Sequence, residues 1–585
     1  PAICSFGIKL CYTCIMGKPG RYIWLMLGLF LAVGFKNTAL AQGGIFSKGA
    51  WGKVGVTVRG VYKIDVAALN SMGLLPAGGV IATDKIRLFG SGGAMLPEAV
   101  GAKRLGSFTE HALMVFDGGD GILSGQDYFI FYAPGPHQWR YDSVGAKYSY
   151  AHHLYSDTAF YFINVDGSVS STISGSAKRM EVGNAPHVNA SAAIRVNRFT
   201  DYWVYEKDNI NLLSSGKLWL ADRFSVAAGG TSARNYSIDI PDLVSTDSVR
   251  FDVSLAARSI GVPPSFAVRV NNNLAQNIAL PAVSGGFLDN YASYVHASFS
   301  VLPSSGNLQL NIQFLPGTGG GSLSAEGFLD KIECAATRVL RMNNSGAVGG
   351  SVGALFFRTT PQSIAAAASA AFVIDAGGVS NFVNSIVFDV TDFTAPTKME
   401  GSFSAGAVPE FVFNNNTSVA REYVAFTPAQ VLVPASFAAA PNNNLHELMA
   451  KASANYLIIT HPSLLAAANK LAAFHVQNNE GITPLVVTTT QVYQAFGSGA
   501  PDITAIRDCI AAFARAYGAV GGTAGNTALS KFYALLFGAS SYDYKNRITN
   551  NVNLVPGYQS SASLDPLSSY TSDDYFALLD SSANI

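Results

Sequence analysis

The stretch NYLIITHPSLLAAANKLAAFHVQNNEGITPLVVTT, residues 455–489, decides the fold of the C-terminal part of the chain. Its first six residues form a short apolar run that predicts a buried strand. A helix is predicted next, because Pro462 suits a first helical position and Gly481 suits a helix end. The run TPLVVTT (483–489) then predicts a second strand. A strand that returns through a helix to another strand forms a right-handed crossover in a parallel sheet.

The same alternation continues towards the C-terminus. Asp502 precedes the segment ITAIRDCIAAFARAYG (503–518), whose apolar residues recur at helical spacing, so Asp502 is a candidate helix cap. The run KFYALLFG (531–538) predicts a third strand. Residues 442–585 are therefore expected to form the first half of an α/β domain with a parallel sheet.

The rest of the chain has the pattern of β structure. WGKVGVTVRGVYKIDV (51–66) alternates apolar and polar residues around Gly60, which predicts a hairpin. From residue 167 to 441, short runs such as SVRFDVSLAAR and NLQLNIQFLP are separated by clusters of Gly, Asn, Ser and Pro. This spacing is typical of β-sandwiches. The chain is expected to be multidomain, with an amino-terminal β domain at 42–166 and one or more β-sandwich domains at 167–441.

The composition of the chain argues against nucleic acid as a partner. Charged residues make up 13% of the chain, against about 25% in an ordinary soluble domain. Lys plus Arg and Asp plus Glu number 38 each, and no dense basic block occurs. Because phosphate binding needs clustered cations, nucleic acid is not expected as a partner. The low charge and the many glycines are typical of a β-rich exported protein.

The N-terminal residues predict export. Met16 is followed by two basic residues, the apolar run 22–35 and the small-x-small sequence Ala39-Leu40-Ala41. This order is that of a signal peptide, and the run is too short for a comfortable membrane span. We expect a signal peptide at 16–41 that is cleaved after Ala41. Residues 1–15 are expected to be upstream sequence translated by mistake.

The cysteines predict buried thiols rather than a disulfide. Three of the five precede Met16, which leaves Cys334 and Cys509 in different predicted domains. A disulfide would need their Cα atoms within about 7 Å, so two free, buried thiols are the favoured interpretation. Cys509 falls on the apolar side of its predicted helix, where a thiol is inert rather than nucleophilic.

Candidate chemistry lies in the loops that follow the predicted parallel strands, where ligands gather in such sheets. His461 follows the first strand and is a candidate base, but no partner acid or nucleophile is evident. The favoured interpretation is that its imidazole caps the turn before Pro462. Asp543 lies in the loop after the third strand. Asp573 and Asp574 are adjacent carboxylates that either bind a cation or face water.

A calcium site is a weaker hypothesis. FDGGDGILSGQDY (116–128) places Asp117, Asp120 and Asp127 among flexible glycines, and these carboxylates are oxygen ligands of the kind that calcium takes. The EF-hand order is not met, so a solvated turn is favoured. Residues 349–353 match the hydrolase elbow pattern by letters but lack the following helix, so we interpret the match as chance.

Several long motifs carry a family resemblance. They include KIRLFGSGGAMLPE (85–98), VFDGGDGILSGQDYFIFYAPGPHQW (115–139), LLFGASSYDYKNR (535–547) and YTSDDYFALLD (570–580). With the segments between them, they resemble the type IX secretion-system sortases, which are gingipain-type (C25) cysteine peptidases. The resemblance covers nearly everything from residue 51 to the end, and it implies a caspase/gingipain-like fold for the α/β part.

The resemblance implies a function at the cell surface. Such a protein is exported to the outer membrane, where it removes carboxyl-terminal sorting domains from secreted cargo and works with other secretion components there. A thiolate attacks the scissile carbonyl and an acyl-enzyme forms. The resemblance implies no required cofactor. Calcium, suggested by the aspartates at 117, 120 and 127, is the one metal that the sequence indicates.

The catalytic pair of that family is not found in this sequence. The family has a His in a Gly-His-Gly turn and a later Cys at a strand end, and neither motif occurs here. No catalytic residue is therefore assigned in this chain, which is expected to be a carboxyl-terminally truncated fragment. Two alternatives stay open. One is a β-rich adhesion or glycan-binding surface protein with an accessory α/β module, and the other is a non-catalytic paralogue, for which Ala539 in place of the family's Asp is slight support.

Overall fold

The computed structural model describes residues 44–579. The gaps within this range are 103, 107, 143–146, 172, 174, 184–193, 319–323, 343–352, 360–368, 380, 405, 451–452, 479–480 and 519–530. The predicted signal peptide with its cleavage point after Ala41, and residues 349–352 of the elbow-like pattern, lie outside the described residues. Within the described part, no helix is both long and apolar enough to cross a membrane.

The first β region consists of two antiparallel sheets over one core. Their strand orders are β30-β1-β11-β4-β5 and β2-β8-β6. Ile64, Leu88 and Phe131 are fully buried where the two sheets meet. The elements are β1 (Trp51–Val56), β2 (Gly60–Asp65), α1 (Val66–Ser71), β3 (Ile81–Ala82), β4 (Arg87–Gly90), β5 (Thr109–His111), β6 (Met114–Phe116), β7 (Ile122–Leu123), β8 (Tyr128–Ala133), β11 (Ala159–Asn164) and β30 (Ser436–Ala440).

The hairpin predicted around Gly60 is wrong. β1 pairs with β11 and β30, whereas β2 pairs with β8. Residues 57–59 connect the two sheets. The alternating pattern therefore predicted the two strands correctly, but it did not predict which strands they pair with. Most of β1 is buried, and only Lys53 among its six residues is partly exposed, as expected for a strand with packing on both faces.

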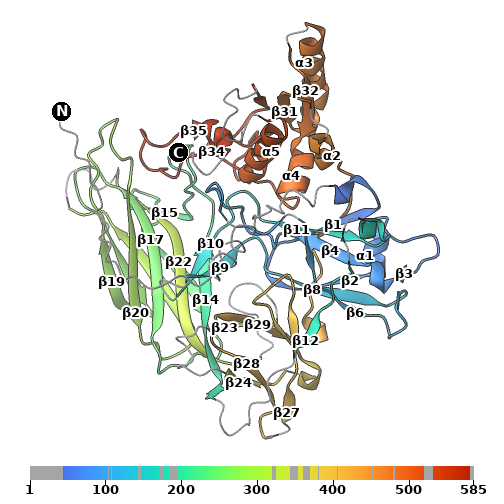
Figure 1. The fold of residues 1–585 in the computed structure, drawn as a ribbon. Helices are drawn as coiled ribbons and strands as arrows, with labels where there is room; N and C mark the ends of the chain where they lie inside the picture. The colour runs from blue at the N-terminus through green and yellow to red at the C-terminus, as the bar shows by residue number, and fades with distance from the viewer. Residues whose placement is uncertain are drawn as a thin grey trace, which may run out of the picture. The chain divides into compact units, whose positions relative to one another are not determined.

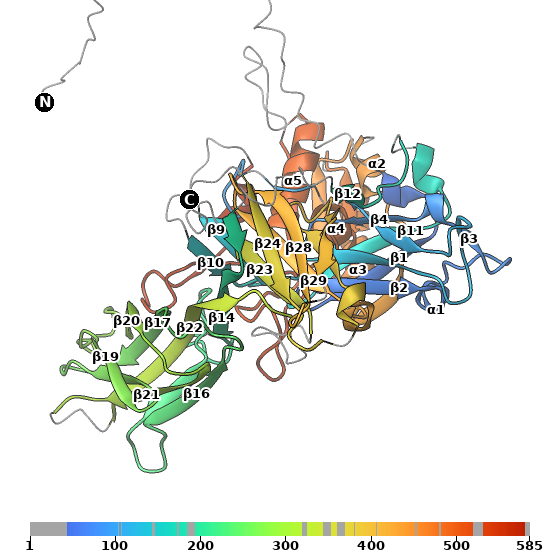
Figure 2. The same cartoon turned by 90° about the horizontal axis from the view of Figure 1, so that it is seen from below.

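The second β region is a sandwich (Figure 2). One sheet has the order β14-β22-β17-β20, with β15 also paired to β22, and the other has the order β16-β21-β18-β19. Side chains of both sheets, Phe251 and Phe266 among them, form one core, as expected for packed antiparallel sheets. The strands are β14 (Arg198–Glu206), β15 (Asp222–Ser225), β16 (Ala233–Asp239), β17 (Val249–Arg258), β18 (Ser265–Val270), β19 (Asn273–Ala279), β20 (Ser293–Val301), β21 (Asn307–Leu315) and β22 (Glu326–Val339).

A third β region follows, and a separate two-stranded hairpin lies at β9 and β10. The two sheets of the third region have the orders β12-β26-β25-β29-β23 and β13-β24-β28-β27. Phe357 and Tyr423 stack in its core, and the Phe372 ring packs beside Tyr423 at a tilt. The strands are β9 (Gln138–Asp142), β10 (Lys147–Ala151), β12 (Glu181–Gly183), β13 (Ile194–Val196), β23 (Leu355–Thr359), β24 (Ser369–Asp375), β25 (Ile386–Asp389), β26 (Thr397–Met399), β27 (Ser402–Ser404), β28 (Glu410–Asn416) and β29 (Arg421–Phe426).

The C-terminal part is the predicted parallel α/β sheet (Figure 1). β31 (Tyr456–Thr460) lies between β32 (Pro484–Thr488) and β33 (Tyr533–Phe537), and both neighbours run parallel to it. The fold class, β domains followed by an α/β unit, is confirmed. Leu457 and Ile459 of β31 share a core with α5. The helices are α2 (Leu445–Ala450), α3 (Leu465–Gln477), α4 (Thr489–Phe496) and α5 (Ile503–Ala516).

Caps explain where two of these helices begin. Asp502 caps α5, since its Oδ1 accepts a hydrogen bond from the Thr504 amide at 2.7 Å. α4 was not predicted. It begins directly after β32, where Thr488 and Gln491 form a capping box. Thr488 is both the last residue of β32 and the cap of α4. Because no loop separates the two elements, the sequence pattern did not show where α4 begins.

Candidate functional site

The carboxyl end of β31 is organised by hydrogen bonds. Thr460 is fully buried, and its hydroxyl donates to the Phe537 carbonyl of β33 at 2.8 Å. His461 follows it, and its Nδ1 accepts from the Ser463 amide at 3.2 Å and contacts the Ser463 hydroxyl at 2.8 Å. The imidazole thus caps the turn at Pro462–Leu464, which is the role that the sequence favoured over a catalytic base.

Asp543 holds together the loop that follows β33. The residue is 1% exposed. Its Oδ2 accepts from the Ile548 amide at 2.8 Å, its Oδ1 accepts from the Lys545 amide at 3.2 Å, and its carbonyl accepts from the Asn551 side chain at 2.7 Å. Both carboxylate oxygens are engaged by backbone donors, so Asp543 shapes the loop rather than offering a free base.

Asp573 and Asp574 are exposed at the start of a short 3₁₀ turn, Asp574–Ala577. The aromatic residues that follow them are buried instead. The Tyr575 hydroxyl lies 2.7 Å from the Thr504 hydroxyl of α5, and Phe576 packs in the same core. Among the described residues, no hydrogen bond or ion pair joins His461, Asp543, Asp573 and Asp574 to one another. The structure does not bring these sequence candidates together as one site.

The three aspartates suggested for calcium each close a local turn. Asp117 accepts from the Gly119 amide at 3.0 Å, Asp120 accepts from the Ile122 amide at 2.9 Å, and Asp127 accepts from the Ser124 amide at 2.8 Å. In the part of the chain that the structure describes, no group of three or more His, Cys, Asp or Glu is arranged to hold a metal ion. Calcium binding stays a prediction, without a preformed cluster to support it.

Both cysteines of the described chain are free and buried, as predicted. Cys334 lies on β22 and Cys509 on α5. Burial raises the pKa of the Cys334 thiol to about 12, and burial raises the pKa of Cys509 as well. A nucleophilic cysteine needs a lowered pKa and access to substrate, so neither thiol has the properties of a peptidase nucleophile.

A partly buried ionic cluster that was not predicted from the sequence fixes the loop after β33. Lys545 Nζ lies 3.0 Å from Asp208 Oδ2, 2.9 Å from Asp157 Oδ1 and 2.9 Å from His152 Nε2. Arg547 adds an ion pair to Asp157 at 2.6 Å. We call these residues, together with His137, whose ring stacks on that of His152 at 4.4 Å, the Lys545 cluster.

The charges of the Lys545 cluster support one another. Burial raises the pKa of Asp208, but its hydrogen bonds with His152 and Lys545 and the charge of Lys545 outweigh burial and hold the pKa below its usual range. The same balance, with His137 and Lys545 as the partners, lowers the pKa of Asp157. Both carboxylates are therefore ionised at neutral pH. A signal existed in the sequence, since adjacent histidines and the run DYKNR (543–547) stand out in a chain so poor in charge.

A second contact joins the motif around Glu98 to α5. Glu98 accepts from the Tyr155 hydroxyl at 2.6 Å and pairs with Lys217 at 2.6 Å. Its backbone carbonyl accepts from Arg507. Nearby, the Leu96 amide donates to the second oxygen of Asp502 at 2.9 Å. The first β region is thus joined to the first turns of α5 by buried polar groups.

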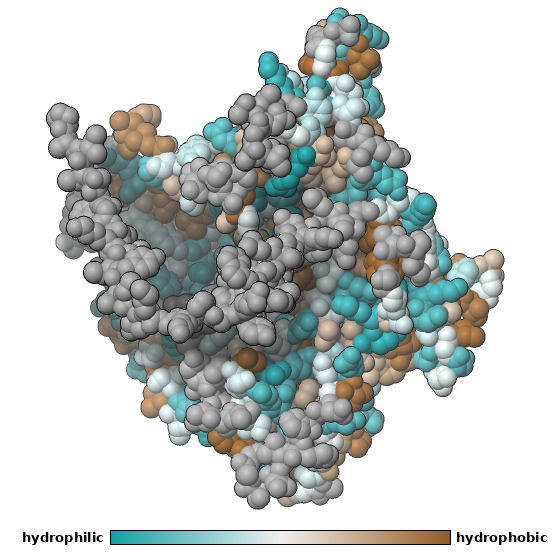
Figure 3. Space-filling model, viewed as in Figure 1, coloured by the Kyte–Doolittle hydropathy of each residue, from teal (hydrophilic) through white to brown (hydrophobic). Residues whose placement is uncertain are grey.

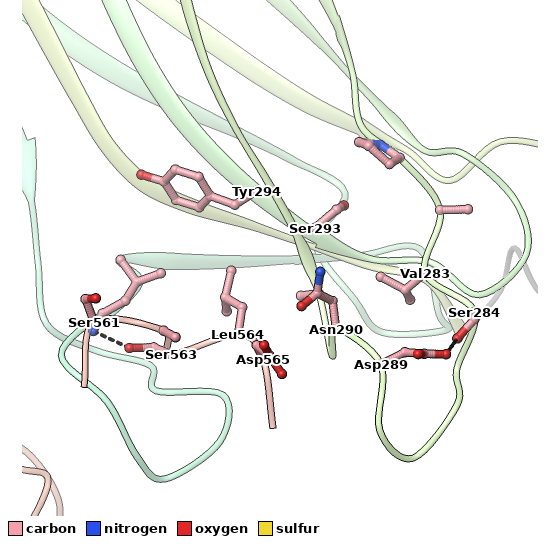
Figure 4. Close-up of a pocket in the computed structure, with 15 residues that line it drawn as sticks. Val283, Ser284, Asp289, Asn290, Ser293, Tyr294, Ser561, Ser563, Leu564 and Asp565 are labelled. Carbon is pink, nitrogen blue, oxygen red and sulfur yellow. Dashed lines mark hydrogen bonds between the residues drawn. The ribbon is translucent and has the colours of Figure 1, made fainter. Parts of the chain in front are cut away.

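A groove of about 860 Å³ lies between the sandwich and the segment 561–565 (Figure 4). The Ser563 hydroxyl accepts from the Leu218 amide at 2.8 Å, and the Tyr291 amide donates to the Leu564 carbonyl at 2.8 Å. Figure 4 shows polar side chains on both sides of the groove. This surface presents hydroxyl, amide and carboxylate groups, which suit hydrogen bonding to an extended polar ligand. The labelled polar residues are Ser284, Asp289, Asn290, Ser293, Ser561, Ser563 and Asp565.

The α/β part is similar to a known peptidase family. Residues 450–585 match the model of peptidase family C25. Over most of its length the chain has the fold of dimeric latent PorU from Porphyromonas gingivalis, with a TM-score of 0.70 and 21% sequence identity. That match covers 92% of this chain and 47% of the PorU chain, so the chain spans about half the length of PorU. The resemblance to the C25 peptidases that the motifs indicated is confirmed.

Other solved structures match only loosely. A CBM35 module from Cellvibrio japonicus Abf62 covers 24% of this chain and 96% of its own, at 12% identity and a TM-score of 0.14. An exo-β-1,3-galactanase from Phanerochaete chrysosporium covers 36% of this chain and 38% of its own, at 14% identity and a TM-score of 0.13. Likenesses this weak carry no argument about fold or function. No curated protein sequence matches the chain.

Proposed function

We propose that this chain is part of an exported cysteine peptidase of type IX secretion. In this proposal residues 450–579 form the first half of its C25 peptidase domain. The complete protein cleaves carboxyl-terminal sorting domains from secreted cargo at the cell surface, next to other outer-membrane secretion components. The observation that carries the proposal is the match of residues 450–585 to the C25 family.

The two buried thiols support a nucleophile outside residues 44–579. Cys509 is fully buried within α5, and Cys334 is 3% exposed between the sheets of the sandwich. Neither has a histidine as a hydrogen-bond partner among the described contacts. The proposed Cys–His pair, in which the thiolate attacks the scissile carbonyl and the imidazole accepts the thiol proton, must then come from another segment of the protein.

The open sheet supports the same proposal. β33 pairs with β31 on one side, and no described strand pairs with its other edge. Tyr533 on β33 is 47% exposed, and Phe474 and Val476 on α3 are 56% and 60% exposed. Hydrophobic surface is visible over α3 in Figure 3. Further strands and helices of the same domain would cover these side chains and complete the sheet.

The β regions would then hold the peptidase loops in place. The Lys545 cluster and the Glu98 contact attach the loop after β33 and the start of α5 to the first β region. The groove between the sandwich and residues 561–565 is open to an extended polypeptide, which suits a role in positioning cargo. In this proposal the β regions support the peptidase loops and position the cargo.

A labelling experiment on the complete gene product tests the proposal. The full-length protein is treated with an irreversible peptide inhibitor that alkylates the active thiol, and the modified cysteine is located by mass spectrometry. We expect one labelled cysteine outside residues 1–585 and none at Cys334 or Cys509. Substitution of that cysteine by alanine should abolish cleavage of a cargo sorting domain. Specific labelling of Cys509, or no specific labelling at all, would contradict the proposal.

A further inference from the structure

The last strand of one sandwich sheet has a free edge. β20 ends the strand order β14-β22-β17-β20, and in the described part of the chain no strand pairs with its outer side (Figure 1). Its nine residues pair with β17 from Ser293 to Val301 without a shift in register. At about 3.4 Å per residue, a strand of this length presents unpaired backbone N–H and C=O groups along about 30 Å of its outer side.

The features that protect most edge strands are missing from β20. Native edges carry charged residues, proline or bulges, which prevent another chain from pairing with them. β20 has the sequence SYVHASFSV, without Lys, Arg, Asp, Glu or Pro. By contrast, β14 at the opposite end of the sheet contains Arg198, Asp201 and Glu206. In the facing sheet, the pairing of the edge strand β19 shifts register between Val268 and Arg269. The edge of β20 is therefore open to an extended polypeptide.

The side chains of β20 alternate between the two faces of the sheet. Val295 and Phe299 belong to the row that packs against the sandwich core, and both are only partly buried. Tyr294 and His296 belong to the other row and are 42% and 50% exposed. An added strand would continue both rows, with apolar side chains beside the first row and polar side chains beside the second. The edge therefore fits a segment in which apolar and polar residues alternate.

The groove of Figure 4 lies at one end of this edge. Ser293 and Tyr294, the first residues of β20, line the groove together with residues 561–565. Those residues belong to the segment that matches the C25 family. A polypeptide that pairs with β20 and continues past Ser293 would enter the groove and reach the C25 segment. The loop before β20 adds Phe287 and Leu288, which are 91% and 58% exposed and offer apolar surface to a partner.

We propose that β20 binds an extended segment of the cargo polypeptide as an additional strand of its sheet. The bound segment has alternating apolar and polar residues, and its chain continues through the groove to the C25 segment. Backbone hydrogen bonds supply the affinity, and the two rows of side chains supply the selectivity. Cargo is the expected occupant only if the proposed function is right, because the adjoining C25 segment is the reason for a polypeptide substrate to lie there.

Peptide binding to the full-length protein tests the proposal. The probe is a fluorescent peptide of alternating threonine and valine, with a lysine at each end for solubility. One control peptide has the same residues with the valines grouped together. The other is N-methylated at two adjacent central residues, which removes a backbone donor from each edge of the peptide strand. Fluorescence anisotropy should show saturable binding of the probe, and roughly ten-fold or weaker binding of both controls, because hydrogen bonds or matching side-chain rows are lost.

Hydrogen exchange locates the bound peptide on the protein. Amides on the outer side of β20 have no strand partner in the free protein, so they should exchange rapidly. The probe should protect these amides and leave those of β19 unchanged. A footprint on β20 alone would distinguish strand addition from adhesion of the peptide to exposed apolar side chains elsewhere.

Two variants at one position connect the binding to the edge. In Val295→Lys the lysine extends into water in the free protein, but an added strand would bury its charge, so probe binding should fall by roughly ten-fold or more. Val295→Thr keeps a β-branched, uncharged side chain and should retain most of the binding. Leu274→Lys, at a position on β19 that is 55% exposed, is the matched control and should have no effect. Thermal unfolding checks the fold of each variant, and the N-methylated peptide tests the edge without any variant.

Three results would overturn the proposal. The first is no saturable binding of the probe, or equal binding of the N-methylated control. The second is binding that a folded Val295→Lys does not weaken. The third is protection of all β20 amides in the free protein, which would mean that the edge is already covered. Sedimentation would then show a dimer if a second copy covers it, and a monomer if another segment of the same chain does.

The peptidase proposal and the β20 proposal can fail separately. One labelled cysteine without probe binding would refute the role of β20 and leave the peptidase intact. Probe binding without thiol labelling would refute the peptidase, and β20 would then be a strand-binding edge without a cargo role.

Discussion

Replacing Lys545 by methionine should loosen the loop after β33 without unfolding the chain. The Lys545 side chain is 5% exposed and lies 3.0 Å from Asp208, which is itself 11% exposed. Methionine keeps most of the unbranched side chain but lacks the ammonium group, which contacts Asp208, Asp157 and His152 together. The two carboxylates would then face each other with Arg547 as their remaining cation.

The expected loss follows from burial. Removing one partner of a buried ion pair costs about 3–5 kcal/mol. Here Arg547 stays 3.5 Å from Asp208, and Asp157 is 41% exposed and therefore screened by water. Both features reduce the cost, so we expect Lys545→Met to lower the free energy of loop opening by about 2–3 kcal/mol. That free energy corresponds to a roughly 30- to 150-fold loss of protection, at about 1.4 kcal/mol for each factor of ten.

Native-state hydrogen exchange measures this local opening directly. The amide of Ile548, which donates to Asp543, lies in the affected loop. Its peptide should lose protection in Lys545→Met while peptides of β17 and β22 stay unchanged. Lys63→Met is the matched control, because Lys63 is 38% exposed and its single ion pair, with Asp65, spans 3.7 Å. The addition of Asp208→Asn to Lys545→Met should restore part of the protection. Equal protection in Lys545→Met and Lys63→Met would refute the role given to the cluster.

Three further predictions concern Asp502, Thr488 and the two buried cysteines. Burial raises the pKa of Asp502 to about 7, so its stabilising contribution is complete in acid and is lost as pH rises from about 4 to 7. The unfolding temperature should therefore fall more between pH 5 and 8 in the native protein than in Asp502→Asn, and equal slopes would contradict this. Thr488→Ala should cost about 1 kcal/mol through the lost cap of α4, seen as faster hydrogen exchange in residues 489–496 alone. Iodoacetamide at pH 8 should leave Cys334 and Cys509 unmodified in the folded protein, and alkylation of either would show that its burial is wrong.

Much of the α/β fold could be predicted from the sequence because its signals are local. The strands of the parallel sheet are short apolar runs, and Pro462 and Asp502 mark helix starts. The side chains of His461 and Asp502 cap these starts by accepting from backbone amides two residues further on. The pairing of β1 could not be predicted in the same way. Alternation shows that a strand has two faces, but it does not show which distant segment supplies the neighbouring strand.

The candidate site was harder to predict because its contacts are distant in sequence. Lys545 and His152 are 393 positions apart, and Lys545 and Asp208 are 337 apart. No local pattern reports such contacts. The motifs indicated a resemblance to the C25 peptidases, but the sequence candidates His461 and Asp543 have structural hydrogen bonds in this structure. The ion pairs of the Lys545 cluster instead join residues that are distant in sequence, and the motif that contains Lys545 does not show its partners.

We propose that residues 450–579 form the front half of a C25 peptidase domain whose catalytic pair lies in another segment. Sequencing the gene beyond the codon for Ile585 tests it most directly. We expect an open reading frame that encodes a Gly-His-Gly turn and then a cysteine at the end of a predicted strand. A stop codon at that point, or a continuation that lacks both motifs, would show that the proposal is wrong.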